Sequence, residues 1–284
     1  MSGQGEPDAV LQGFIDKWLA VQPQQRVALV FVDGARYPGH LALAALEQEL
    51  LAAAYGIREP QVAVAKLHWW AEELGGAAAS GGRHPLTKVL FDDERAYAIA
   101  SEIWLAPVLA AMVQLEQGTA ADFSAQLGAA MPLHGALAAL ETAWWYGADA
   151  SAERAARVAV LSHLLYALLR LEQDAERDRL PLPMAQLARH GLSRAQLRAP
   201  GAARQQAVRG QLQDLQASWR ESVALAGPLS VFRALESHHV RRLAQRAATA
   251  TDALAALQAG QPRSGLATTL QAWRAARAWQ RQLG

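Results

Sequence analysis

Four side chains that can ionise or donate hydrogen bonds recur along one expected helix near the middle of the chain. Its positions i, i+3, i+7 and i+11 carry His163, Tyr166, Arg170 and Asp174. At about 100° per residue, these positions fall within one narrow sector of an α-helix. Such a sector is either a solvated surface or the wall of a binding site, and the pattern leaves both interpretations open.

The opposite face of the same helix is apolar. Leucines recur there at three- and four-residue steps, at Leu161, Leu164, Leu165, Leu168 and Leu169. This spacing predicts a stripe that packs against the core. A charged segment, DAERDRLPLP, follows, and its two prolines end the helix. The four polar side chains therefore share the face opposite to the apolar stripe.

The elements that must position these side chains are almost all helical. Alanine and leucine, both strong helix formers, dominate the sequence, and apolar residues rarely alternate with polar ones. The strand-like run at 26–32 is too short to found a sheet. We expect helices at about 8–20, 38–55, 60–78, 85–97, 104–117, 121–146, 151–175, 202–225, 229–257 and 267–282. Because the loops separate segments of one character, we expect a single all-α domain over residues 1–284.

Composition excludes several classes of protein. The 284 residues are 52% hydrophobic and 19% charged, which suits a domain with a large core. They include no cysteine, so disulfide and thiolate chemistry are excluded. Neither a signal-peptide pattern nor a long apolar run is evident, and we therefore expect a cytoplasmic protein.

Charge is divided unevenly along the chain. Residues 1–188 carry 13 basic and 22 acidic side chains, whereas residues 189–284 carry 14 basic and 4 acidic ones. Either the two halves attract each other, or the basic C-terminal surface meets an acidic protein partner or an anionic membrane. No nucleic-acid-binding motif accompanies the arginines, so we expect no nucleic acid as a partner.

The segment after the polar helix resembles a motif of the squalene/phytoene synthase family, the head-to-head prenyl transferases. DAERDRLPLPMAQLARHGLS follows the second half of the family pattern QxxNxxRDxxEDxxxGRxYLPxxxLxxxGL. Nearer the N-terminus, KLHWWAEEL (66–74) and HPLTKVL (84–90) resemble the family's KLxWWRxEL and HPVxxAL. The resemblance implies a terpenoid-synthase-like helical bundle around a central cavity, across which two aspartate-rich helices face each other.

Set against the family, the first helix has lost its metal-binding aspartates and the second keeps only one. On the second helix the family's Gln, Asn, Asp and Asp fall on His163, Tyr166, Arg170 and Asp174, which leaves Asp174 as a weak remnant of the metal site. On the first helix the aspartates fall on Leu51, Ala52 and Tyr55 and the preceding arginine on Gln48, with Glu47 and Glu49 out of register. Because Mg²⁺ is usually held by carboxylates and substrate phosphates, we expect no cofactor here, with Mg²⁺ as the alternative.

A second resemblance points the same way. LEQEL (46–50) is similar to FNxEL, which stands at the aspartate positions in a phytoene-synthase-like mitochondrial complex I assembly factor. The family resemblance thus implies candidate ligand- or diphosphate-binding residues without an assigned catalytic residue: Arg36, Gln48, Lys66, His163, Tyr166, Arg170, Asp174 and Arg179. Arg170 either binds an anion bidentately or neutralises Asp174 in a structural ion pair. For Lys66 the alternative is a side chain that reaches to solvent.

Three functions fit these observations. The first is a non-catalytic homologue that acts in binding or assembly, with an isoprenoid or lipid-like ligand, a protein partner, or a peripheral contact to the inner face of a membrane. The second is an active prenyl transferase that condenses isoprenyl diphosphates, and the third is a carrier of a polyisoprenoid or quinone. A void of several hundred Å³ between helices 38–55 and 151–175 would indicate a ligand site, and a packed interior would indicate a scaffold.

Overall fold

The apolar periodicity of the chain produces helices throughout the structure, a computed structural model. It describes residues 5–176, 180–260 and 265–283, and these contain no strand. The elements are α1 (Gly5–Val21), α2 (Gln25–Ala28), α3 (Pro38–Tyr55), α4 (Pro60–Ser80), α5 (Pro85–Phe91), α6 (Arg95–Ala98), α7 (Ser101–Gln114), α8 (Phe123–Tyr146), α9 (Glu153–Leu169), α10 (Leu171–Glu176), α11 (Met184–Arg189), α12 (Arg194–Leu197), α13 (Ala202–Glu221), η1 (Ser222–Ala224), α14 (Val231–Thr249), α15 (Ala253–Ala259) and α16 (Leu266–Leu283).

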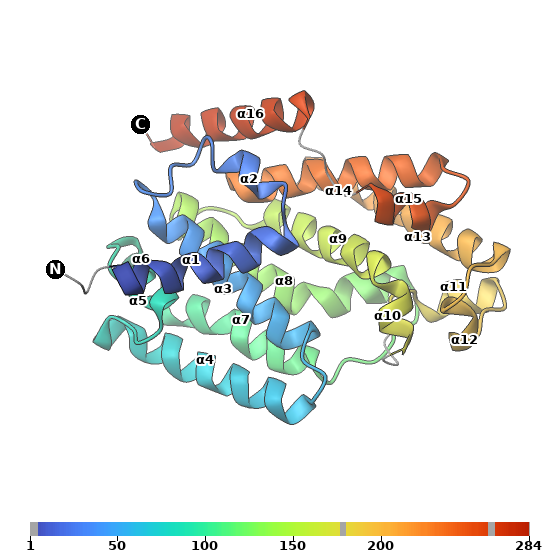
Figure 1. The fold of residues 1–284 in the computed structure, drawn as a ribbon, viewed down its shortest axis with the longest axis horizontal. Helices are drawn as coiled ribbons and strands as arrows, with labels where there is room; N and C mark the ends of the chain where they lie inside the picture. The colour runs from blue at the N-terminus through green and yellow to red at the C-terminus, as the bar shows by residue number, and fades with distance from the viewer. Residues whose placement is uncertain (1–4, 177–179, 261–264, 284) are drawn as a thin grey trace.

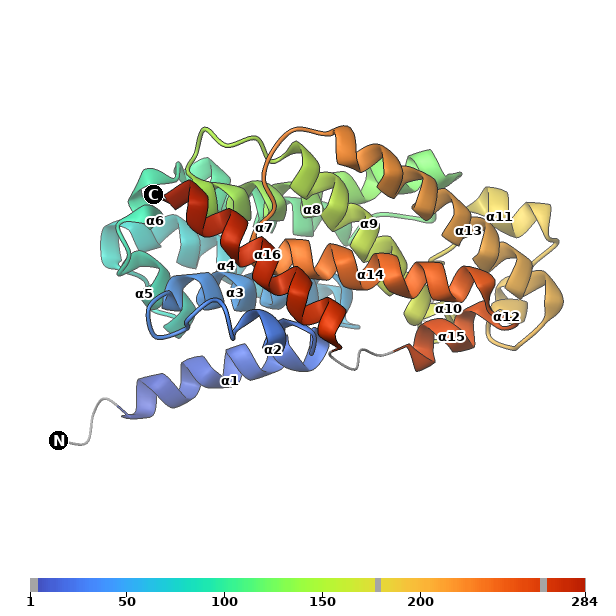
Figure 2. The same ribbon diagram turned by 90° about the horizontal axis from the view of Figure 1, so that it is seen from above.

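The long helices form one elongated bundle, with α16 lying across α14 and α2 (Figures 1 and 2). The short helices α10, α11 and α12 lie together at the end of the bundle farthest from α5 and α6. The hydrophobic core of the bundle falls into two large clusters. One joins α3, α4, α7 and α16, and the other joins α9, α13 and α15, while α8 and α14 contribute side chains to both. The described residues therefore form the single helical domain expected from the sequence.

Several helix ends follow local sequence signals. Pro38 and Pro60 open α3 and α4 in the first turn, where a proline loses no helical hydrogen bond. The helix expected at 104–117, with Pro107 in its first turn, begins earlier, because α7 starts at Ser101 and holds this proline in its interior. Pro132 likewise lies inside an unbroken α8. Tertiary packing stabilises both helices despite the local cost of an interior proline.

The expected helix at 151–175 is divided at Arg170, one of the candidate binding residues. α9 ends at Leu169, and the backbone of Arg170 leaves the regular helical geometry with φ −99° and ψ 12° before α10 begins. The expected helix at 229–257 also divides, because Ala250 is extended and Asp252 caps a separate α15. No helix among the described residues is long and apolar enough to cross a membrane.

Candidate functional site

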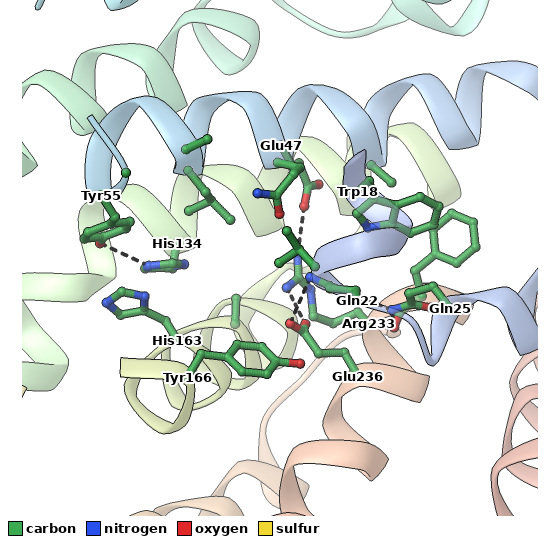
Figure 3. A pocket seen from close by; sticks show the side chains of 18 of the residues that line it. Trp18, Gln22, Gln25, Glu47, Tyr55, His134, His163, Tyr166, Arg233 and Glu236 are labelled. Atoms are coloured by element: carbon green, nitrogen blue, oxygen red, sulfur yellow. Dashed lines mark hydrogen bonds and ion pairs between the residues drawn. The ribbon is translucent and has the colours of Figure 1, made fainter. Parts of the chain in front are cut away.

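A cavity of about 480 Å³ lies between α3 and α9, with α8 and α14 forming further walls and α1 and α2 beside them (Figure 3). Its position and size are those expected of a ligand site. One face of α3 lines it at i, i+3, i+4, i+7, i+8 and i+11, with Ala44, Glu47, Gln48, Leu51, Ala52 and Tyr55. Opposite this face, α9 presents Ala159, His163, Tyr166 and Leu169. The interior is therefore an open cavity with mixed apolar and polar walls.

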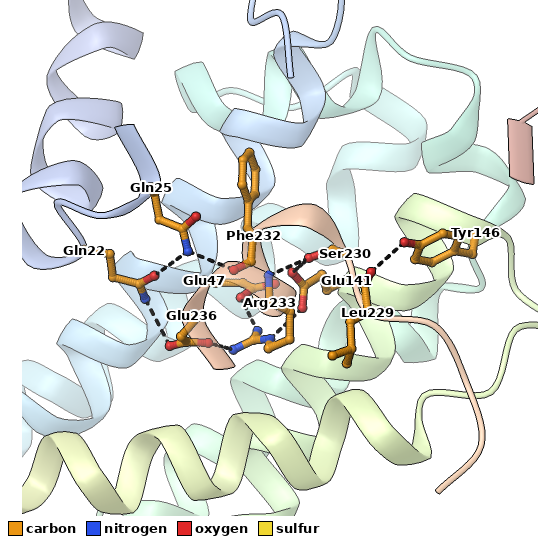
Figure 4. Close-up of polar contacts among 10 residues, drawn as sticks. All are labelled: Gln22, Gln25, Glu47, Glu141, Tyr146, Leu229, Ser230, Phe232, Arg233 and Glu236. Carbon is orange, nitrogen blue, oxygen red and sulfur yellow. Dashed lines mark hydrogen bonds and ion pairs between the residues drawn. The ribbon is translucent and has the colours of Figure 1, made fainter. Parts of the chain in front are cut away.

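One guanidinium and three carboxylates form a buried cluster at the wall made by α14 (Figure 4). Arg233 donates from Nε to Oε2 of Glu141 at 2.8 Å and from Nη1 to Oε2 of Glu236 at 2.7 Å. Its Nη2 donates to Oε2 of Glu47 at 3.1 Å. The four side chains are only 6% to 13% exposed. This Arg233 cluster therefore joins α3, α8 and α14 at the cavity.

Neutral side chains hold the Arg233 cluster in place from two directions. Ser230, the N-cap of α14, donates its hydroxyl to Oε1 of Glu141. Gln22 donates from Nε2 to Oε1 of Glu236 over 3.5 Å. Gln25 donates to the side chain of Gln22 at 3.1 Å and to the carbonyl of Phe232 at 2.9 Å. The segment from α1 to α2 is thus attached to the start of α14.

The Arg233 cluster holds more acids than bases, and burial changes their titration. Burial first, and then the neighbouring Glu141, raise the pKa of Glu47 well above its usual range, although Arg233 acts in the opposite direction. Burial also raises the pKa of Glu236. The cluster therefore retains protons at pH values where an exposed glutamate has lost them.

Three aromatic side chains lie together at the side of the cavity away from Trp18 (Figure 3). The ring of Tyr55 stacks on His163 with centroids 4.5 Å apart, and His163 lies 4.2 Å from His134. The hydroxyl of Tyr55 is 3.2 Å from Nε2 of His134. Burial lowers the pKa of His163 to about 3 and that of His134 well below its usual range. Both imidazoles are therefore neutral near pH 7, and the stack carries no cation.

Five of the candidate residues expected from the sequence line this cavity: Gln48, His163, Tyr166, Arg170 and Asp174. Arg170 is 44% exposed, and its Nε lies 3.8 Å from Oδ2 of Asp174. The ion pair, one of the two alternatives for Arg170, is thus present in the structure. Because Arg170 remains partly exposed and lines the cavity, an anion could also approach it.

Of the other three candidates, Arg36 and Lys66 do not line the cavity in the structure. Arg36 is exposed and lies over the ring of Tyr37, 5.2 Å from its centroid. Lys66 donates to Oε2 of Glu49 at 2.7 Å and is absent from the cavity lining. Arg179 lies outside the described residues. The structure thus separates Lys66 and Arg36 from the residues gathered at the cavity.

Sequence reasoning missed the Arg233 cluster. Glu47 was expected out of register with the family's aspartates, yet it shares the cavity face of α3 with Gln48 and Leu51. A signal was present, because Glu141 is an isolated acid within an apolar helical stretch and Glu47 lies in another apolar stretch with only Glu49 nearby. Such acids are buried only with a partner, although the sequence does not indicate that Arg233 is that partner.

The described residues show no metal-binding arrangement. In residues 5–176, 180–260 and 265–283, no three His, Asp or Glu side chains are grouped so that they could hold a metal ion. Glu172, two residues before Asp174, accepts a hydrogen bond from Arg204 at 2.8 Å.

Comparisons with known proteins agree on the fold. No protein-family model and no curated protein sequence matches the chain. A dehydrosqualene synthase solved in complex with ligand matches with a TM-score of 0.66 and 10% identity, over 97% of this chain and 99% of that chain. Squalene synthase HpnC from Alicyclobacillus acidocaldarius matches with a TM-score of 0.59 and 16% identity, over 88% and 93%. The chain thus has the helical fold of squalene/phytoene synthase-like proteins.

Proposed function

We propose that this protein binds an isoprenoid or a similarly elongated apolar ligand in the cavity between α3 and α9, and that it does not ionise a diphosphate there. The observation that carries the proposal is the open volume of about 480 Å³ within a fold shared with squalene synthases. Leu51, Ala52 and Leu169 offer apolar contact along its walls. An open cavity of this size favours ligand binding over a purely structural scaffold.

The residues on the two facing helices support binding rather than diphosphate ionisation. Departure of a diphosphate requires that its developing charge be neutralised, commonly by metal ions held on carboxylates. Here Gln48 and Tyr55 stand on α3, and the neutral His163 stands opposite on α9. The cation that lines this part of the cavity, Arg170, is paired with Asp174.

The direct test is to identify the ligand that purifies with the protein. Protein purified without detergent is extracted with organic solvent, and the extract is analysed by mass spectrometry. We expect an isoprenoid lipid in an amount comparable to that of the protein. Ala52→Phe, which adds a ring to the cavity wall, should purify without the lipid, whereas Ala65→Phe on the exposed face of α4 should retain it. Wild-type protein that carries no lipid, and binds none on addition, contradicts the proposal.

Turnover provides a separate test. The purified protein is incubated with farnesyl or geranylgeranyl diphosphate and Mg²⁺, and the products are measured by gas chromatography. We expect no condensation product, because the facing positions lack the acids that would hold the metal. Mg²⁺-dependent product formation would overturn the non-catalytic part of the proposal and support the prenyl transferase alternative.

A further inference from the structure

We infer that the Arg233 cluster selects a ligand whose polar end is a cation, such as an amine, and disfavours an anionic end such as a diphosphate. The inference rests on the proposed function, since it names the head group of the ligand that the cavity holds. It concerns the buried wall formed by Glu47, Glu141, Arg233 and Glu236, which lies among the cavity-lining residues.

Arg233 has little capacity left for an anion. Its three nitrogens already donate to three different carboxylates at distances from 2.7 Å to 3.1 Å. Two of its five N–H groups remain, but a phosphate oxygen that accepted from them would lie next to these carboxylates. Repulsion between like charges is strong where burial removes water. The guanidinium therefore completes an internal network and is not a free phosphate site.

The cluster instead offers unsatisfied acceptors to the cavity. Among the described residues no donor reaches Oε1 of Glu47, and the side chain of Glu47 is partly open to the cavity. Within the part of the chain that the structure describes, Oε1 of Glu236 has only the long contact of 3.5 Å from Gln22. An ammonium group carries up to three N–H donors and one positive charge. It would satisfy these oxygens and reduce the excess of negative charge.

Aromatic rings add a second source of attraction for a cation. Trp18 and Tyr166 line the cavity on either side of the Arg233 cluster in Figure 3. The faces of such rings attract cations, most strongly where water is excluded. Burial raises the pKa of Glu47 and Glu236, which is the expected response of acids that lack enough counter-ions. Geometry and charge therefore both favour a cationic head group.

The test compares ligands that share one chain and differ at one end. Binding of farnesylamine, farnesol and farnesyl diphosphate to the full chain is measured by isothermal titration calorimetry at pH 7. We expect farnesylamine to bind at least about tenfold more tightly than farnesol, because charge-assisted hydrogen bonds are roughly twice as strong as neutral ones. Farnesol or farnesyl diphosphate binding as tightly as farnesylamine would overturn the inference.

Variants locate the effect at the Arg233 cluster. Glu47→Gln and Glu236→Gln keep the shape of each side chain and remove its charge, so each should weaken farnesylamine roughly tenfold and leave farnesol unchanged. Glu49→Gln, on the same helix but paired with Lys66, is the matched control and should change neither affinity. Circular dichroism confirms folding of each variant. A folded Glu47→Gln protein with wild-type affinity for farnesylamine contradicts the assignment.

Dodecylamine separates this inference from the proposed function, because it has the cation without the isoprenoid chain. If farnesol and farnesylamine bind equally, the proposed function stands and the inference fails. If dodecylamine binds through Glu47 but no farnesyl compound does, the isoprenoid assignment fails and the cation site stands. If none of the four compounds binds, both are wrong.

Discussion

His163 shows how burial converts a titratable residue into a neutral wall of the cavity. Its ring contacts those of Tyr55 and His134, and its pKa falls to about 3 through burial and then through the charge of Arg170. A lowered native-state pKa means that the unfolded chain binds the proton more readily. His163 therefore supports the folded state above pH 6.5, and this contribution is lost as pH falls from 6.5 toward 3.

The exchange His163→Phe tests this linkage. Phenylalanine keeps an aromatic ring in the stack and removes the titration. Between pH 7 and pH 5, the free energy of unfolding of the wild type should fall by about 2 kcal/mol more than that of the variant. Urea unfolding at both pH values provides the measurement, and His68→Phe, at an exposed histidine of α4, should behave as the wild type. Equal pH dependence in the wild type and His163→Phe would contradict the buried neutral state.

A second prediction at the scale of single residues concerns Arg233. Arg233→Met leaves three buried acids without their common partner, and we expect a loss of about 3–5 kcal/mol in the free energy of unfolding at pH 8. The loss should be smaller at pH 5, because protonated glutamates need no counter-ion.

Arg83→Met is the control for Arg233→Met. The Arg83 side chain is 67% exposed, and its buried partner Glu73 keeps hydrogen bonds from the backbone N–H groups of Arg83 and His84 and from the hydroxyl of Thr87. The exchange should therefore cost no more than about 1 kcal/mol. Chemical denaturation measures both variants. A cost for Arg233→Met within that of the control would show that the Arg233 cluster does not stabilise the fold.

At the scale of elements, the cavity depends on the close approach of α3 to α8. Gly39, in the first turn of α3, lies so near the ring of Trp144 that an added Cβ would overlap it. The ring cannot easily move, since Trp144 is buried and its indole N–H lies 3.4 Å from Nδ1 of His40. This contact sets how closely α3, which carries Glu47 and Tyr55, approaches α8.

Gly39→Ala should therefore destabilise the protein. Overpacking of a filled core costs about 1–3 kcal/mol, which differential scanning calorimetry would detect as a lower Tm. Gly128→Ala is the matched control in α8, where an added Cβ meets no atom within 4 Å. It should raise stability by about 0.5–1 kcal/mol through helix propensity. A Gly39→Ala protein as stable as the wild type would show that the α3–α8 contact has room to adjust.

At the scale of the whole molecule, α16 presents a surface that the bundle does not cover. Its inner face packs Ala272, Ala276 and Trp279 into the core. Its outer face exposes Leu266 (91%), Leu270 (43%) and Trp273 (43%) beside the exposed Arg274, Arg277 and Arg281. Apolar side chains flanked by arginines on one helix suit the interface of an anionic membrane. We propose this outer face of α16 as the surface for a peripheral membrane contact, which is one of the alternatives that the charge distribution left open.

Vesicle co-sedimentation tests this contact. We expect the wild type to bind vesicles containing phosphatidylglycerol and to bind pure phosphatidylcholine at least about tenfold more weakly, because each arginine near an anionic surface contributes about 1 kcal/mol. Trp273→Glu should lose the binding. Leu109→Glu, at an exposed leucine of α7, should retain it. Binding that is indifferent to lipid charge, or a Trp273→Glu protein that still binds, would exclude α16 as the contact.

The local pattern of apolar and polar residues predicted much of the secondary structure of this molecule. The 3.6-residue periodicity predicted the helical class, and α3 has the bounds expected from Pro38 and the apolar run after it. The rotation of about 100° per residue predicted that His163 and Tyr166 share one face of α9, and both line the cavity. These features depend on residues close together along one helix, so their periodicity can be recognised in the sequence without knowledge of the tertiary structure.

Tertiary structure decided how those faces meet. Arg233 reaches Glu47 across 186 positions of the chain, and no local pattern pairs the two residues. Lys66 matched a family motif, yet its ammonium contacts Glu49 and lies apart from the cavity lining. The sequence by itself determined which side chains share a helix face. Packing between distant helices determined which faces enclose a void and which charges become partners, because burial and pairing depend on neighbours that only the folded chain brings together.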